Sequence, residues 1–203
     1  MKKRTAAVKR ATRETDITVK LNVDGSGKSR IKTGIGFLDH MLELFAFWGF
    51  FDLEISTGTC DLKVDIHHTN EDIGIVLGQA FKKALGDKKG IRRFGFAGVP
   101  MEEVVGKAVL DINGRGFLDI KTTGIPVGRI IPSEGYRFEY AEHFFDGLAK
   151  HLGMNLNIRI ENANRDLHAA LEPVFKALGL ALDQATQIDP RRKGVPSTKG
   201  VID

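Results

Sequence analysis

The sequence has only one cysteine and lacks a long apolar run. A single cysteine, Cys60, excludes an internal disulfide, which is typical of proteins in reducing compartments. No apolar stretch is long enough to cross a bilayer. The basic start, MKKRTAAVKRATRE, is not followed by the apolar core of a secretory signal. We therefore expect a cytoplasmic protein with no membrane partner.

A basic stripe on the body of the chain is also missing. The formal charge is +4, but residues 1–13 hold six lysines and arginines and no acidic residue, so the remainder carries −2. Nucleic-acid proteins usually carry a basic surface on the folded body, with aromatic side chains interleaved. We therefore expect no nucleic-acid partner. The basic arm is assigned to solvent, a subunit contact or an anionic ligand.

The hydrophobic pattern predicts alternating strands and helices in one compact unit of ordinary size. The expected strands cover residues 16–23, 51–56, 62–66, 104–112, 117–121 and 156–160. The expected helices, where apolar side chains recur at helical spacing, cover residues 36–48, 70–85, 140–152 and 170–185. The C-terminal segment PRRKGVPSTKG reads as a loop that is mobile unless a ligand binds it.

The two halves of the chain repeat each other. A shift of 101 residues aligns two of the expected helices and places His67 on His168 and Glu71 on Glu172. A shift of 103 residues aligns the other two helices and places Asp39-His40 on Glu142-His143. Five of the six histidines lie at these four repeated positions: His40, His67, His68, His143 and His168. Such self-similarity indicates a duplicated architecture.

Histidines and carboxylates in this pattern predict a divalent metal site. Imidazole is the commonest neutral ligand for first-row divalent cations, and carboxylates join it readily. Two such side chains three or four residues apart at a helix start can reach one point. Capping or surface roles would explain a lone histidine, but not five of six at symmetry-related positions.

With these residues the sequence resembles the imidazoleglycerol-phosphate dehydratase family. The matching segments follow the family's order over nearly the whole chain: VKRATRET at 8–15, TGIGFLDHML at 33–42, DIHHTNEDIGIVLGQA at 65–80, GIRRFG at 90–95, NGRGFL at 113–118, EHFFDGLA at 142–149, LEPVFKALGLAL at 171–182 and PSTKG at 196–200.

The resemblance implies an α+β fold of two internally duplicated βα halves. Each half is expected to pack a sheet on helices, with a ribosomal S5 domain 2-like arrangement. The halves are expected at residues 1–92 and 93–190, followed by a phosphate-binding tail at 191–203. The resemblance also implies a large symmetric homo-oligomer, usually of 24 subunits, with sites between subunits.

The family removes water from imidazoleglycerol phosphate, a small anionic substrate, to give imidazoleacetol phosphate in histidine biosynthesis. The resemblance implies one or two Mn²⁺ ions per subunit, with other divalent metals as alternatives. One ion would take His40, His68, His168 and Glu172. The other would take His67, Glu71, His143 and the residue at 169. These cations would hold the negative charge that develops on the imidazole when a C–H proton leaves.

The resemblance also implies roles for individual side chains. Glu14 corresponds to the family's acid/base carboxylate. The implied catalytic set is Glu14, His67, Glu71, His168 and Glu172. The implied substrate-phosphate set is Arg93, Arg115, Lys176, Ser197, Thr198 and Lys199, in which arginine suits bidentate phosphate contacts and lysine acts as a point charge.

Three residues depart from the family pattern. Ala169 replaces a histidine ligand, Trp48 replaces a histidine that contacts substrate, and Asn157 replaces a histidine in a strand. Three protein ligands with water can still hold a divalent ion. The sequence therefore allows an active dehydratase with a modified site, a paralogue acting on another phosphorylated azole or polyol, or a non-catalytic metal-binding assembly protein. Glu14 and the phosphate set favour the two enzymes.

Overall fold

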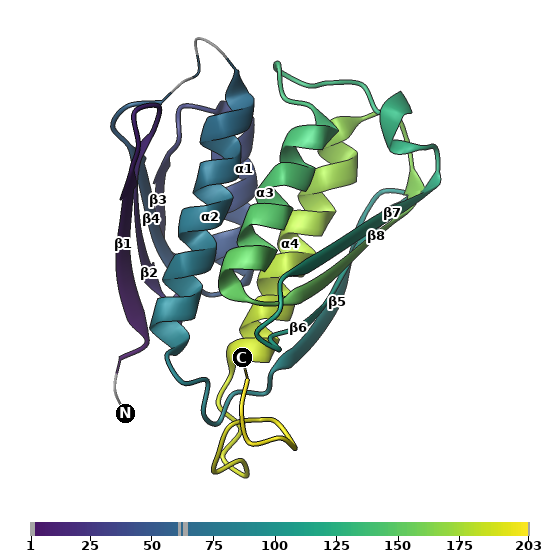
Figure 1. The fold of residues 1–203 in the computed structure, drawn as a ribbon. Helices are drawn as coiled ribbons and strands as arrows, with labels where there is room; N and C mark the ends of the chain where they lie inside the picture. The colour runs from purple at the N-terminus through teal and green to yellow at the C-terminus, as the bar shows by residue number, and fades with distance from the viewer. Residues whose placement is uncertain (1–2, 61, 63–64, 203) are drawn as a thin grey trace.

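Two four-stranded sheets form the outer layers of the protein, and four α-helices lie between them (Figure 1). The structure is a computed structural model that describes residues 3–60, 62 and 65–202. Within those residues, no helix combines the length and the apolarity needed to span a membrane.

The first sheet contains β1 (Thr5–Ala11), β2 (Asp16–Asn22), β3 (Ser29–Lys32) and β4 (Asp52–Thr57) in the order β1-β2-β4-β3. Strand β3 runs parallel to β4, and the other pairs are antiparallel. In β2 the alternation is clear, because Ile17, Val19 and Leu21 are buried while Lys20 faces outward. Helices α1 (Gly36–Trp48) and α2 (Ile66–Leu85) cover the buried face.

The second sheet repeats this plan. It contains β5 (Phe94–Met101), β6 (Val104–Asp111), β7 (Phe117–Gly124) and β8 (Asn155–Ala163) in the order β5-β6-β8-β7, with β7 parallel to β8. Helices α3 (Phe138–Leu152) and α4 (Leu167–Thr186) cover its inner face, and a short 3₁₀ helix spans Val127–Arg129. The predicted duplicated α+β fold is confirmed. Each half has its sheet on one side and its helices on the other.

Small residues let the helices of the two halves approach closely. A Cβ atom at Gly74 of α2 would lie 2.3 Å from the carbonyl oxygen of Phe144 in α3, and one at Gly179 of α4 would lie 2.5 Å from that of Phe45 in α1. Aromatic side chains fill the remaining space between helices, including Phe175, and burial of each such ring contributes about 1.5–3 kcal/mol.

The helix pairs α1–α4 and α2–α3 each run side by side in the same direction. Gly74 meets Phe144, and one turn later Gly78 meets Leu148. The first turns of α1 and α4 therefore meet, as do those of α2 and α3. All the expected His and Glu positions except Glu14 lie in the first two turns of these helices.

All four predicted helices are confirmed, with small differences at their starts. Helix α2 begins at Ile66 and α4 at Leu167, earlier than expected, because Asp65 and Asp166 cap their first turns. The strand expected at residues 62–66 is wrong at the residues that the structure describes, since Leu62 lies in a turn, Asp65 caps α2 and Ile66 is helical. Residues 61, 63 and 64 lie outside the described residues. Strands β1, β3 and β5 were not predicted.

Candidate metal and phosphate sites

Two aspartates fix the histidines at the starts of α2 and α4. The Asp65 carboxylate accepts the backbone N–H of His67 at 3.1 Å, and Asp166 accepts that of His168 at 2.8 Å. Asp65 also accepts the hydroxyl of Tyr140 at 3.1 Å. The His67 backbone N–H holds the pKa of Asp65 below its ordinary value. Each cap thus orients the helix turn that carries a candidate ligand.

His40, His168 and Glu172 form a compact cluster where α1 meets α4. Their candidate ligand atoms all lie within 4.8 Å of one another. Glu172 Oε2 lies 2.6 Å from His168 Nε2 and 3.4 Å from His40 Nε2. Two imidazoles and a carboxylate converging in this way fit a divalent cation, which binds such atoms at about 2.0–2.2 Å.

Lys176 faces the other oxygen of the same carboxylate. Its Nζ donates to Glu172 Oε1 at 2.5 Å, one helical turn along α4. Burial acts to raise the pKa of Glu172, but hydrogen bonds from Lys176 and His168 outweigh it and hold the pKa below its ordinary value. Glu172 is therefore ionised at neutral pH, with Oε2 turned towards both histidines.

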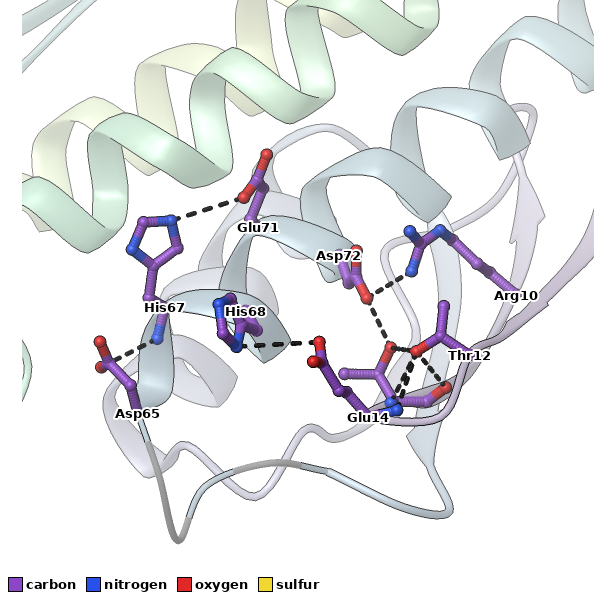
Figure 2. Close-up of polar contacts among 9 residues, drawn as sticks. Arg10, Thr12, Glu14, Asp65, His67, His68, Glu71 and Asp72 are labelled. Atoms are coloured by element: carbon purple, nitrogen blue, oxygen red, sulfur yellow. Dashed lines mark hydrogen bonds and ion pairs between the residues drawn. The ribbon is translucent and has the colours of Figure 1, made fainter.

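The symmetry-related set at the start of α2 and α3 is more loosely arranged. The rings of His67 and His143 stack with centroids 4.0 Å apart. His67 Nε2 lies 3.5 Å from Glu71 Oε2 (Figure 2). Over the described part of the chain, only the His40 cluster brings three ligand atoms within 4.8 Å of one another. His67, Glu71 and His143 are neighbours, as the repeat predicted, but their ligand atoms do not all lie within 4.8 Å of one another.

His68 lies beside Glu14 in the same subunit. The His68 Nδ1 and Glu14 Oε2 atoms are 3.9 Å apart (Figure 2). The predicted grouping of His68 with His40 is therefore not seen within the described residues of one chain. Ala169, which matches His68 in the repeat, is buried and offers no ligand atom.

The expected phosphate-binding residues other than Lys176 meet elsewhere, around a cavity of about 300 Å³. We call this set the cation cradle. It is lined by Arg93, Asn113, Arg115, Ser197, Thr198, Lys199, Val201 and Ile202. The sequence reasoning missed Asn113, although it lies in the NGRGFL segment. Its side-chain oxygen accepts the backbone N–H of Arg115 at 2.8 Å.

Arg93 holds the cradle together. Its guanidinium donates to both carboxylate oxygens of Asp111, at 2.6 and 2.9 Å, and to the carbonyl of Pro196 at 2.9 Å. The hydrogen bond to Asp111 raises the pKa of Arg93 further. Arg93 therefore ties the C-terminal segment to β6, while the exposed Arg115 and Lys199 face the cavity.

The cradle and the His40 cluster lie at opposite ends of α4. Arg93 N–H donates to the Ala185 carbonyl at the last turn of the helix, whereas Glu172 lies near its start. Thirteen residues separate these positions, which corresponds to about 20 Å along a helix. In Figure 1, α4 starts at the top and ends at the bottom, where the yellow C-terminal segment lies. Of the expected phosphate set, Lys176 alone lies with the histidines.

Trp48 also lies away from the histidines of its own chain. It is the last residue of α1, 41% exposed, and packs edge-on against Phe47 with ring centroids 5.5 Å apart. His40 lies eight residues earlier, about 12 Å along the helix axis. Within one chain, position 48 therefore does not lie beside the candidate metal ligands.

Comparison with known proteins gives a consistent result. Residues 33–182 match the family described as imidazoleglycerol-phosphate dehydratase. The imidazoleglycerol-phosphate dehydratase of Pelobacter propionicus is 48% identical over 200 residues, covering 98% of this chain and 99% of that protein. That of Maridesulfovibrio salexigens is 48% identical over 203 residues, covering all of both chains.

Solved structures agree with the sequence relatives. The imidazoleglycerol-phosphate dehydratase of Staphylococcus aureus is 30% identical with a TM-score of 0.77, covering 91% of this chain and 99% of that one. The Pyrococcus furiosus protein is 34% identical with a TM-score of 0.79, covering 96% and 99%. The chain therefore belongs to the imidazoleglycerol-phosphate dehydratase family.

Proposed function

We propose that this chain is a hydro-lyase that converts imidazoleglycerol phosphate to imidazoleacetol phosphate in histidine biosynthesis. The observation that carries the proposal is the convergence of His40, His168 and Glu172 in a member of this family. Full-length similarity to named dehydratases favours this function over a paralogue or a non-catalytic assembly protein. Product formation by the purified, Mn²⁺-loaded protein tests it, and a folded, metal-loaded protein without turnover would contradict it.

We propose Mn²⁺ as the resident ion. One ion is held by His40, His68, His168 and Glu172, of which His68 can come from another subunit, and the second by His67, Glu71 and His143. Mixed imidazole and carboxylate ligands suit Mn²⁺ among several divalent metals. When bound, the cations supply Lewis-acid stabilisation of negative charge on the substrate's imidazole. The three ligand atoms of the first cluster are already close together, so we expect this site to bind more tightly than the second.

The chain's own side chains transfer the proton and bind the substrate phosphate. Dehydration removes a C–H proton and a hydroxyl group. The Glu14 carboxylate accepts the proton and returns it to the departing hydroxyl, which leaves as water. Glu14 suits this role because its side chain is 60% exposed and can reach a bound substrate. In the cradle, Arg115 and Lys199 bind the substrate phosphate.

We propose that the complete site forms between subunits of a 24-subunit homo-oligomer in the cytoplasm. The separation of about 20 Å along α4 supports this, because one small substrate cannot span the cradle and the His40 cluster of a single chain. Exposed apolar side chains beside the cradle, on the outer face of the second sheet, suit a subunit contact. They are Phe94, Phe96, Val109 and Phe117.

Replacing Ala169 by histidine is expected to tighten the second metal site. The new imidazole restores the ligand that the repeat predicts there, so the Kd for the weaker Mn²⁺ should fall about tenfold or more. Metal bound per subunit, measured across an Mn²⁺ titration, checks this. Ala169→Phe adds bulk without a ligand atom and serves as the control. If the histidine variant binds no more metal than the wild type, position 169 is not a ligand position.

A further inference from the structure

Glu14 lies in the short turn between β1 and β2, with its side chain largely in solvent. A carboxylate that removes a proton must be held within a fraction of an ångström of the reacting atom. A surface turn does not provide that precision by itself, because such turns are mobile unless other groups fix them. The position of the Glu14 carboxylate therefore depends on the contacts that the turn makes with the rest of the protein.

The turn is first fixed internally by Thr12. The Thr12 hydroxyl oxygen accepts the backbone N–H of Glu14 at 3.1 Å and that of Thr15 at 2.9 Å. The Thr12 backbone N–H donates to the Thr15 carbonyl at 2.8 Å. These bonds set the backbone conformation on both sides of Glu14. They do not attach the turn to the rest of the protein.

Asp72 of α2 provides that attachment. The Thr15 hydroxyl donates to Asp72 Oδ2 at 2.5 Å, and the Arg10 guanidinium donates to the same oxygen. Thr15 is fully buried and the Asp72 side chain is only 13% exposed. Figure 2 shows Asp72 of α2 facing Arg10 and the turn that carries Glu14. Charge-assisted hydrogen bonds shielded from water are among the stronger polar contacts.

Helix α2 also carries the neighbouring candidate metal ligands. Asp72 directly follows Glu71, and His67 and His68 lie one turn earlier. Figure 2 shows Glu71 next to His67 while Asp72 faces the turn. The Glu14 Oε2 atom lies 3.9 Å from His68 Nδ1. One rigid helix thus fixes both the metal ligands and the support of Glu14.

We propose that Asp72, acting through Thr15 and Arg10, is a positioning residue that holds the Glu14 carboxylate in register with the ligands on α2. The proposal rests on the proposed function for its catalytic consequence. Its structural content, attachment of the turn to α2, is independent of that function.

Thr15→Val tests the proposal because it removes the hydroxyl and keeps the buried shape. We expect kcat to fall about 10- to 100-fold, with KM and bound metal unchanged. Thr15→Ser keeps the hydroxyl and should recover most of that loss. Thr18→Val, on the outward side of β2, is the matched control for a threonine-to-valine change close to the turn. A Thr15→Val variant with wild-type kcat would overturn the proposal.

A second comparison separates positioning from general stability. If Thr15 acts through Glu14, Thr15→Val should have almost no further effect on the residual rate of a Glu14→Gln variant. An equal loss of rate in both backgrounds would show that Thr15 acts in some other way. Melting temperatures of all the variants identify any that are simply unstable.

Hydrogen exchange tests the attachment without any need for turnover. The backbone amides of Glu14 and Thr15 should exchange about tenfold faster in Thr15→Val than in the wild type and Thr15→Ser, because the turn opens more often when it is released from α2. Equal exchange in all three proteins would refute the attachment. If exchange changes as expected but the wild type has no dehydratase activity, the proposed function fails and the structural inference stands.

Discussion

Replacing Glu14 by glutamine is expected to slow dehydration by about 100- to 10,000-fold, the range that general acid–base groups supply. The amide keeps the size and hydrogen-bonding capacity of the side chain but cannot accept the proton. The side chain is exposed and distant from the core, so folding should not change. KM and bound Mn²⁺ are expected to stay near wild-type values, and steady-state kinetics with metal analysis check this.

Glu102→Gln provides a matched control for that result. Glu102 lies exposed in the turn between β5 and β6, the counterpart of the Glu14 turn in the second half. We expect the control to retain wild-type turnover. Turnover of Glu14→Gln at the wild-type rate would remove Glu14 from the mechanism.

Replacing Glu172 by glutamine is expected to empty the proposed metal site at His40, His168 and Glu172 under ordinary conditions. His40 and His168 would lose the anionic oxygen that they share, and Lys176 would lose its ion pair. Changes in groups that merely support a metal ligand cost about 10- to 100-fold in affinity, so loss of the carboxylate itself should cost more. Mn²⁺ titration with a turnover readout checks this. Wild-type affinity would exclude Glu172 as a ligand.

Mixing two damaged subunits tests whether the site is shared. Glu172→Gln damages the metal cluster, and Arg115→Ala damages the cradle at the other end of α4. If each site combines one subunit's cluster with another's cradle, random co-assembly leaves about a quarter of sites with both parts intact. We expect the mixture to regain activity that neither variant has alone. If activity does not return in oligomers shown to contain both variants, each site lies within one subunit.

The helices could be predicted from the sequence because their apolar side chains recur every three or four residues. Strands β1 and β5 lack the corresponding strand signal, a regular alternation of apolar and polar side chains. β5 contains Gly95, Gly98 and Pro100, which disfavour a strand on propensity alone. Gly95 is required by tertiary packing, because a Cβ there would lie 1.9 Å from the carbonyl oxygen of Ala181 in α4. A contact of this kind cannot be predicted from local sequence.

Some contacts of the candidate site could also be predicted from the sequence, and others could not. The pairing of His168 with Glu172 follows from helical spacing, and the approach of His40 followed from the internal repeat and the family resemblance. The link from Asp72 to Thr15 joins residues 57 positions apart that belong to no histidine pattern, so it required the fold. The role of Lys176 in binding the substrate phosphate stays a prediction, because in this structure its amine donates a hydrogen bond to Glu172.

We infer that this chain is a metal-dependent dehydratase despite Trp48 and Ala169. The most direct test measures turnover of imidazoleglycerol phosphate by the purified, Mn²⁺-loaded protein and counts bound metal in the same sample. We predict formation of imidazoleacetol phosphate, loss of activity on chelation, and recovery when Mn²⁺ is returned. A folded protein that binds Mn²⁺ at the His40 cluster but forms no product would contradict the claim.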